Sequence, residues 1–453
     1  MMNSKKNITI LHFKTGERDG VSLEIEKRAR ILTALGANVA YIAGFDGLKR
    51  DRACCIEELD AEADYNRFLR EQCFRSGHFD ESTMLAFYYQ LEWKIYTRLQ
   101  EAFTQRRPDT VFVHNMFSHG CNLPATTALL KVLDTFETPT VAVHHDFWYE
   151  REQLQQPQYA FIQQILDGLP PKRDYILKHQ VINSFACEDT LRRRGIQAET
   201  IGDYFDFQQP VPQIDAYNAD LQARLGIRDH DLVIVHATRI TGHKVIENAL
   251  LFAHELEQRI RAAAPITLAG KGLTSDSRVV VLLPNFVEPE AESYFQALQT
   301  YQKRLDVRAI WAAEHFLPER RQNADQKIYS FWDSYVIADL VTYTSIHEGF
   351  GNQLLEAIYF QKLPVILEYP VFEKDLRHEG YEYVSLGRSR ELTSHNGLRL
   401  TGLDKVRSAV EQTIDLLQQP GKKAELVMKN FEIARTHHDV EVLRQDLERC
   451  LTV

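Results

Sequence analysis

Short apolar runs alternate with amphipathic stretches from the start of the chain. The run over residues 8–13 (ITILHF) predicts a β-strand. Apolar residues then recur every three or four positions over 21–35, and Gly36 follows, which indicates an amphipathic helix with a glycine after its last turn. Residues 38–43 (NVAYIA) predict a second strand. This strand–helix–strand order favours a parallel sheet with right-handed crossovers.

The same rhythm continues through the first half of the chain, with one interruption. Residues 47–107 are charged and aromatic, and we interpret them as a helical insertion. Beyond them, strands are predicted at 110–114, 140–144, 180–183 and 200–207, and helices at 123–136 and 152–167. The pattern over residues 1–207 is therefore typical of a doubly wound α/β lobe.

A polar, proline-bearing stretch, residues 208–228, predicts a linker to a second α/β series. That series comprises predicted strands at 232–237, 266–269, 307–311, 340–342 and 365–367, with helices at 245–264, 405–418 and 422–450. We assign residues 229–435 to a C-terminal lobe and expect residues 436–453 to pack back on the N-terminal lobe as a terminal helix. The prediction is an α/β protein of two Rossmann-like, doubly wound lobes with a cleft between them, where ligands bind at the carboxyl ends of the strands.

Composition excludes several classes of protein. The 453 residues carry a formal net charge of −10, which argues against a surface for nucleic acid. The six cysteines form no C-x-x-C pair and no zinc-ligand spacing, so we expect reduced thiols, no metal and a cytoplasmic protein. No run is long and apolar enough to cross a membrane, and the N-terminus lacks the features of a secretory signal. A homo-oligomer is left open: the aromatic stretch 84–103 is one candidate face, and packing within the lobe is the use that we favour for it.

The most informative segment is 344–364 (TSIHEGFGNQLLEAIYFQKLP), which connects two predicted strands. Its two glutamates, Glu348 and Glu356, are eight residues apart. On one helix they would be ~12 Å apart along the axis, too far to bind one group together. Gly349 and Gly351 allow a tight turn with a close approach of the backbone. We therefore expect Glu348 on a loop and Glu356 in the second turn of the helix that follows.

Asn352 is a favourable N-cap and is expected to begin that helix. The N–H groups and positive dipole of the helix N-terminus form an anion site suited to a diphosphate. A carboxylate at Glu356 can accept two hydrogen bonds from a ribose diol, while Glu348 can face a sugar. The alternative is a glycine loop followed by an amphipathic helix with two solvated glutamates.

The segment EGFGNQLLEA resembles the E-x7-E signature of the family-4 retaining glycosyltransferases with the GT-B fold. The resemblance covers about residues 7–435, with 47–107 as the main departure. Within the superfamily, the segments VHHDFWYERE and ADLVTYTSIHEGFGNQLLEAIYFQKLPVI are most similar to enzymes like the mannosylglucosylglycerate synthases, which build small glycosides from a sugar nucleotide and a glycerate-type acceptor.

The resemblance implies transfer of a hexose, with retention, from a nucleoside-diphosphate sugar to a small polar acceptor. GDP-mannose and UDP-, GDP- or ADP-glucose are the donors in question, and no metal or other cofactor is expected. The implied chemistry is a front-face substitution, in which the acceptor hydroxyl attacks from the side that the nucleotide leaves. The leaving phosphate oxygen takes the proton, so no dedicated protein base is required.

The donor residues follow from the match to the family's motifs. In HATRITGHK, Arg239 and Lys244 match a strand-R-x4-K segment and would neutralise the diphosphate, although two surface cations on a loop are the alternative. The resemblance implies that Glu348 orients the hexose and Glu356 holds the ribose. The remaining donor contacts are expected from Gly349, Phe350, Gly351, Asn352, Lys271 and Gly20. The first turn, KTGERDGVSLE, contains no G-x-G-x-x-G, and a plain connecting turn is its alternative.

The acceptor residues are expected in the N-terminal lobe. In the family a histidine ends a central strand beside the transferred sugar, and His145 fits that place better than His144; a buried core histidine is the alternative. His145 would steady the oxocarbenium-like sugar. The acceptor-side candidates are Asp146, Trp148 for stacking on a sugar, Arg151 for an acidic acceptor, and Asn115.

Two other functions fit the same fold. A sugar-nucleotide 2-epimerase binds the same donor without transferring its sugar, and the combination of the R-x4-K and E-x7-E patterns argues against it. A non-catalytic protein that binds nucleotide sugars is the second alternative. The presence of Arg239 and Lys244, together with both glutamates, argues against a protein that has lost catalytic activity.

Overall fold

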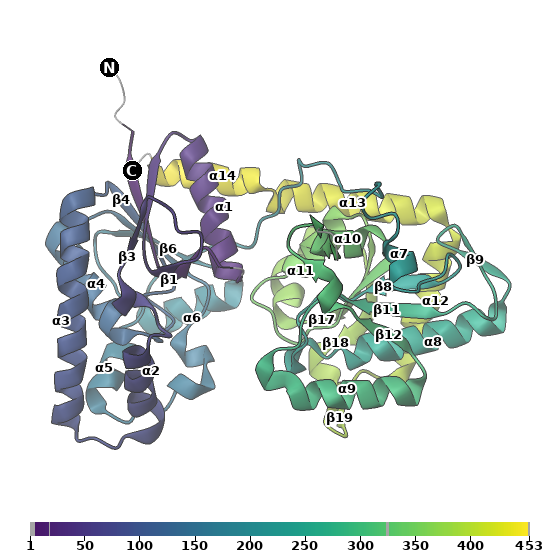
Figure 1. The fold of residues 1–453 in the computed structure, drawn as a ribbon, viewed down its shortest axis with the longest axis horizontal. Coiled ribbons are helices and arrows are strands. Elements are labelled where there is room, and N and C mark those ends of the chain that lie inside the picture. Colours follow the sequence, from purple (N-terminus) through teal and green to yellow (C-terminus); the bar gives the residue numbers. More distant parts are fainter. Residues whose placement is uncertain (1–4, 18, 323–325, 452–453) are drawn as a thin grey trace. The chain divides into compact units, whose positions relative to one another are not determined.

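The computed structural model describes residues 5–17, 19–322 and 326–451, and Figure 1 shows the fold. The chain forms two compact units, Met1–Gly202 with Glu441–Val453, and Asp203–Val440. Each unit is built on a parallel sheet covered by helices, which confirms the two Rossmann-like lobes predicted from the sequence. In the part of the chain that the structure describes, no helix has both the length and the apolar character needed to cross a membrane.

The sheet of the N-terminal unit has seven strands in the order β3-β2-β1-β4-β5-β6-β7, and all its pairings are parallel. Its strands are β1 (Asn7–Thr15), β2 (Asn38–Asp46), β3 (Ala53–Cys55), β4 (Thr110–His114), β5 (Thr140–His144), β6 (Ile176–Val181) and β7 (Glu199–Thr200). The predicted strand at 200–207 is wrong, because β7 is only two residues long. The backbone beyond it forms a bridge from Phe205 to Asp439 instead.

The helices of this unit are α1 (Gly20–Ala34), α2 (Asp64–Glu71), α3 (Glu81–Arg106), α4 (Leu123–Phe136), α5 (Ala160–Asp167), α6 (Ser184–Arg194) and α14 (Val440–Leu451). The stretch 47–107, which the sequence indicates as an insertion, is an integral part of the N-terminal unit. Its strand β3 pairs with β2, and its helix α3 packs Leu99 and Phe103 into the same core as Leu129 of α4. The segment therefore supplies one edge of the sheet and part of a helical layer.

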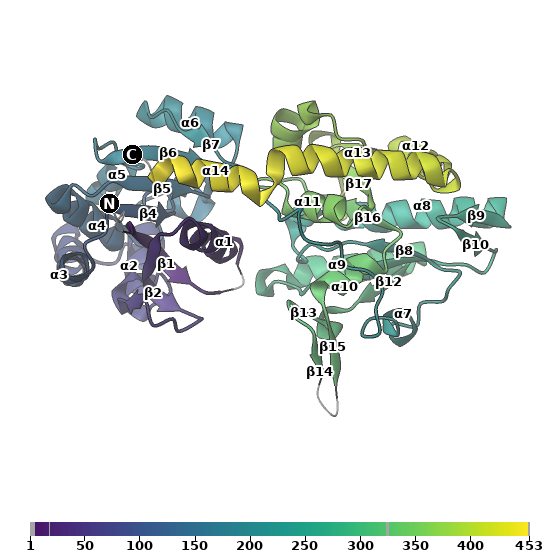
Figure 2. The ribbon, with the colours of Figure 1, turned by 90° about the horizontal axis from the view of Figure 1, so that it is seen from above.

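Helices α1 and α14 lie side by side in both ribbon views (Figures 1 and 2). A buried chain of hydrogen bonds joins them through the sheet. The Gln180 side chain of β6 accepts from Arg28 Nη1 at 2.9 Å and donates from its Nε2 to Asp446 Oδ2 at 2.8 Å. Leu443 and Leu447 of α14 are fully buried in the unit. The C-terminal segment is thereby part of the N-terminal unit's packing.

The sheet of the C-terminal unit has six parallel strands in the order β12-β11-β8-β16-β17-β18. These are β8 (Leu232–Val235), β11 (Val279–Leu283), β12 (Arg308–Trp311), β16 (Leu340–Tyr343), β17 (Leu363–Glu368) and β18 (Val384–Arg388). The sequence reading did not include β11 or β18. The predicted strand at 266–269 lies outside this sheet, because β9 (Ile266–Leu268) pairs only with β10 (Lys271–Leu273) in a hairpin.

The other elements of this unit complete its layers. Its helices are α7 (Leu221–Arg224), α8 (Glu247–Ala263), α9 (Glu292–Leu305), α10 (Phe331–Val336), α11 (Asn352–Tyr359), α12 (Leu403–Gln418) and α13 (Pro420–His438). A small sheet of β13 (Phe316–Leu317), β15 (Lys327–Ser330) and β14 (Arg321–Gln322) projects from the unit in Figure 2, and β19 (Thr393–His395) pairs with β20 (Leu398–Leu400).

Two boundaries differ from those drawn on the sequence. The stretch 208–228 packs into the C-terminal unit, since Leu221, Leu225 and Ile227 belong to one of its cores. The long helix expected at 422–450 is two helices, which meet at Asp439, where φ and ψ are extended. The chain crosses between the units at this break and again near residue 203.

Candidate functional site

An ion pair joins two loops at the carboxyl edge of the C-terminal sheet. Lys244 Nζ donates to Glu348 Oε1 at 2.5 Å, and the Lys244 side chain is 8% exposed. Lys244 lies after β8 and Glu348 after β16, which are neighbours in the sheet. Further bonds tie the same loops together: Ile346 N donates to His243 O at 2.9 Å, and Thr344 Oγ1 donates to Lys244 O at 2.9 Å. The two motifs read separately in the sequence thus form one structure.

Tyr369, the residue that follows the carboxyl end of β17, holds the glycine loop before α11. The Tyr369 hydroxyl is buried and donates to Phe350 O at 2.6 Å. A Cβ placed on Gly351 would lie 2.4 Å from that hydroxyl oxygen. A glycine at 351 is therefore required by the close approach of the Tyr369 hydroxyl group.

Asn352 does not cap α11 as predicted. Gly351 occupies the N-cap position, Asn352 is the first helical residue with an exposed side chain, and no side-chain hydrogen bond caps the helix. The prediction is wrong because Asn352 is already part of the helix, whereas a cap residue has non-helical backbone angles. The cap position falls on Gly351, where Tyr369 leaves no room for a side chain. The first N–H groups of α11 consequently have no side-chain cap, which suits them to an external anion.

We expect Gly351→Ala to lower the free energy of unfolding by about 1–3 kcal/mol, because the added methyl group must push the packed Tyr369 ring aside. Chemical denaturation measures this change. Gly421→Ala is the matched control, since a Cβ at Gly421 meets nothing within 4 Å. Unchanged stability in Gly351→Ala would contradict the packing described here.

Glu356 lies one turn into α11 and is paired with a phenol. Tyr335 Oη donates to Glu356 Oε2 at 2.5 Å. Burial raises the pKa of Glu356 to about 7, an effect that the Tyr335 hydrogen bond opposes. Burial also raises the pKa of Tyr335 well above its usual value, and the charge of Glu356 adds to this. The carboxyl group is thus poised to change its protonation state near neutral pH.

Arg239 has a partner that the sequence analysis did not include. Its Nη1 donates to Glu288 Oε1, while more than half of the Arg239 side chain is exposed. The loop after β11 brings Glu288 there, since Ile240 N donates to Phe286 O at 3.0 Å and the two segments form a bridge. The pairing is long-range and depends on β11, so no local pattern in the sequence could have indicated it.

Lys271 lies away from the other donor candidates. Its Nζ donates to Asp339 Oδ2 at 2.7 Å and to Asp231 O at 3.0 Å. These partners immediately precede β16 and β8, so they mark the amino ends of the strands, whereas Glu348 follows their carboxyl ends. The donor role expected for Lys271 is therefore corrected: the β9–β10 hairpin holds it at the opposite edge of the sheet.

In the N-terminal unit, the loops after β4 and β5 meet at one asparagine. Asn115 has φ +57°, and its Oδ1 accepts from the backbone N–H groups of His145 at 2.7 Å and Asp146 at 3.3 Å. His114 Nδ1 and His145 Nε2 are 3.1 Å apart, with stacked rings. Burial lowers the pKa of His145 to about 4, so its imidazole is neutral at pH 7.

The two adjacent histidines differ in their surroundings. His145 is partly exposed, whereas His144 is fully buried and its Nε2 lies 3.0 Å from His179 Nδ1. Burial lowers the pKa of His144 well below its usual value. His144 therefore fits the role of a core histidine, and the assignment of the sugar-side histidine to His145 stays a prediction.

The other N-terminal candidates lie on the same loops. Arg151 Nη2 is 3.2 Å from Asp146 Oδ2, and Trp148 N donates to Ser118 O at 2.8 Å in the loop after β4. Gly20 is the first residue of α1, and a Cβ there would meet nothing within 4 Å. Its role toward a donor stays a prediction, and among the described residues of this unit no close packing requires a glycine there. Across the described residues, no group of three His, Cys, Asp or Glu side chains has an arrangement that could hold a metal ion.

Comparison with known proteins was made on sequence and on structure. No family model matches the chain. The chain is 32% identical over 422 residues to a mannosylglucosylglycerate synthase of Petrotoga mobilis, covering 91% of this chain and 94% of the relative. It is also 32% identical over 446 residues to a mannosylglucosylglycerate synthase of Thermotoga maritima, covering 98% and 99%.

Many solved structures resemble the chain, among them two that do so over nearly their whole length. One is a glycosyltransferase of Rickettsia africae, with a TM-score of 0.63, 11% identity and 98% of both chains covered. The other is Anabaena HepE in complex with UDP and glucose, with a TM-score of 0.58, 15% identity and 99% of both chains covered. At these identities the likeness bears on the fold, which is the GT-B fold expected from the sequence.

Proposed function

The chain belongs to the family of the mannosylglucosylglycerate synthases, and we propose that it transfers mannose, with retention, from a mannose nucleotide to the glucosyl group of a glucosylglycerate. That it is a glycosyltransferase using a sugar nucleotide follows from the family; the sugar, the acceptor and the stereochemistry are the proposal. The observation that carries it is the ion pair between Lys244 and Glu348, because it sets a cation for the diphosphate beside a carboxylate for the hexose.

The donor half of the reaction is proposed for the C-terminal unit. The diphosphate replaces Glu348 as the partner of Lys244 and Glu288 as the partner of Arg239. It also faces the N-terminus of α11, which has no side-chain cap. Glu348 is then available to accept hydrogen bonds from the hexose hydroxyls, while Glu356 accepts from the ribose diol. These cations supply the positive charge for the leaving group, so we propose that transfer requires no metal.

The reaction we propose occurs on one face of the sugar. The bond from the anomeric carbon to the phosphate oxygen breaks, and its electron pair stays on the diphosphate. The acceptor hydroxyl oxygen bonds to the same face of that carbon, and its proton passes to the leaving phosphate oxygen. We assign to the neutral imidazole of His145 the stabilisation of the cationic sugar through hydrogen bonds to its hydroxyl groups.

The test is product analysis over a panel of donors and acceptors. The enzyme is incubated with GDP-mannose or with UDP-, GDP- or ADP-glucose, each with and without glucosylglycerate, and the products are identified by mass spectrometry. The proposal predicts a mannosylated glucosylglycerate and one equivalent of nucleoside diphosphate. An epimerised nucleotide sugar formed without acceptor would favour the 2-epimerase, and donor binding without any product would favour the non-catalytic alternative.

Donor binding is expected to depend on pH through Glu356. Its raised pKa of about 7 means that the ionised form, which accepts both ribose hydrogen bonds, prevails only above pH 7. Donor affinity should therefore fall about tenfold between pH 8 and pH 6, which calorimetric titration measures. Glu356→Gln should bind donor more weakly and with a flatter pH profile. An unchanged profile in that variant would contradict this assignment.

A further inference from the structure

The loop after β4 ends in a tight turn, His119–Gly120–Cys121, that packs against the acceptor-side loop. Gly120 has φ +76°, and a Cβ there would lie 2.9 Å from the Cβ of Trp148. The turn and the segment around Trp148 are therefore fixed against each other. A backbone hydrogen bond from Trp148 N to Ser118 O joins the same two segments.

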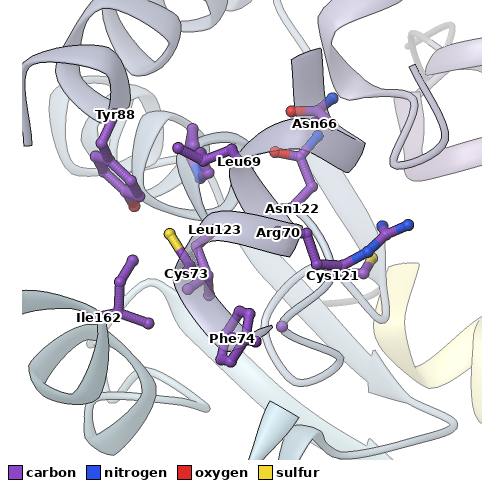
Figure 3. Close-up of a pocket in the computed structure, with 12 residues that line it drawn as sticks. Asn66, Leu69, Arg70, Cys73, Phe74, Tyr88, Cys121, Asn122, Leu123 and Ile162 are labelled. Atoms are coloured by element: carbon purple, nitrogen blue, oxygen red, sulfur yellow. The ribbon is translucent and has the colours of Figure 1, made fainter. Parts of the chain in front are cut away.

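Arginines from two separate elements flank this turn. Arg70 comes from α2, and it lies beside Cys121 among the residues that line a small cavity of about 10 Å³ (Figure 3). Arg151 follows the 3-10 turn Trp148–Glu150. The pKa of His119 is lowered to about 4, first by burial and then by the charge of Arg151, with a smaller contribution from Arg70, while the charge of Asp146 opposes the shift. Both guanidinium groups thus act on the same side chain.

These groups have hydrogen-bonding capacity that the described residues do not use. Arg151 Nε and His119 Nδ1 are buried and have no hydrogen-bond partner within the part of the chain that the structure describes. Arg70 donates to Ala61 O at 2.9 Å and to Glu62 Oε1 at 3.0 Å, and Glu62 is largely exposed. A buried guanidinium N–H without a partner is uncommon and calls for an acceptor of hydrogen bonds. His119 Nδ1 can donate to the same acceptor in the tautomer that carries its proton there.

We propose that Arg70, His119 and Arg151 together bind the carboxylate of the acceptor's glycerate group. Guanidinium groups match a carboxylate in a planar fork, and a neutral imidazole donates one N–H. The acids that now pair with the arginines, Glu62 and Asp146, are both exposed enough to be displaced by a ligand. This inference rests on the proposed function, which supplies an acceptor with a glycerate group.

Lys14, a cation in the last residues of β1 in the same unit, is less suited to this role. Its Nζ is 2.5 Å from Glu17 Oε2 and 3.7 Å from Asp19 Oδ2, so two carboxylates already neutralise it. The arginine pair differs in that, among the described residues, each guanidinium has a single carboxylate partner. The subsite is therefore assigned to the arginines.

The kinetic test compares two acceptors, glucosylglycerate and glucosylglycerol, the second of which has a neutral hydroxymethyl group in place of the carboxylate. Arg70→Gln and Arg151→Gln are each expected to raise KM for glucosylglycerate at least tenfold, while KM for the donor and kcat/KM for glucosylglycerol stay within twofold. Arg67→Gln is the matched control, because Arg67 lies on the same helix and its one ion-pair partner in the described part of the chain is Asp64, at the surface. Equal losses with both acceptors, or no loss with glucosylglycerate, would overturn the assignment.

A binding measurement separates this inference from the proposed function. Saturation-transfer NMR with the full-length protein uses glycerate as the probe and glycerol as its neutral counterpart. We expect the wild type and Arg67→Gln to bind glycerate in preference to glycerol, and Arg70→Gln and Arg151→Gln to lose that preference. A protein that binds glycerate but transfers no mannose to glucosylglycerate would contradict the proposed function and leave the subsite standing. Failure of the wild type to bind glycerate would overturn the subsite.

Discussion

Replacing Lys244 with alanine is expected to lower kcat/KM for the donor by about 10²–10³-fold. Lys244 is the one buried lysine or arginine among the described residues of the C-terminal unit, and we propose that its charge offsets that of the leaving diphosphate. The substitution also leaves the Glu348 carboxylate without its 2.5 Å partner, which we expect to lower the free energy of unfolding by about 1–3 kcal/mol.

The loss of stability and the loss of activity can be separated. In the double variant Lys244→Ala/Glu348→Gln no unpaired carboxylate remains, so stability should return toward that of the wild type while activity stays low. Steady-state kinetics and chemical denaturation of all four proteins measure the two effects in one cycle. Lys405→Ala is the control, because Lys405 forms an exposed ion pair with Glu391. Recovery of activity in the double variant would mean that Lys244 serves only to neutralise Glu348.

Glu348→Gln is expected to change catalysis and nucleotide binding in opposite directions. The amide retains the size of the side chain but is a weaker acceptor for hexose hydroxyls, so kcat should fall about 10²-fold. Lys244 meanwhile loses the carboxylate that competes with the diphosphate, so the free nucleoside diphosphate should bind several-fold more tightly. Titration calorimetry with the nucleoside diphosphate and initial-rate kinetics measure both. Parallel weakening of kcat and nucleotide binding would contradict the proposed exchange of partners.

The elements that define the lobes could be predicted from local pattern. The first strand, the helix ending before Gly36 and the strands at 110–114 and 140–144 have clear periodicity or apolar runs, and the structure confirms them. The interior strand β11 is not predicted from the sequence, although all five of its residues are buried. A short apolar run of this kind lacks the alternation that distinguishes a strand from part of a buried helix.

Part of the site could be predicted from the local sequence, and part of it could not. The loop and helix that carry Glu348 and Glu356 follow from the glycines between them, and the structure places the two glutamates as expected. The pairing of Arg239 with Glu288 and the place of Lys271 depend on how strands are ordered in the sheet, which no local spacing reveals. Asn352 was misplaced because the ring of Tyr369, far along the chain, decides which residue occupies the cap.

The most direct test of the central claim is the anomeric configuration of the first product formed. Proton NMR follows the reaction of α-linked GDP-mannose with glucosylglycerate, and the one-bond carbon–proton coupling at the new anomeric centre reports its configuration. The account predicts an α-mannoside from the first turnover, with release of one nucleoside diphosphate per glycoside. A β-mannoside would contradict front-face transfer at the site formed by Lys244, Glu348 and Glu356.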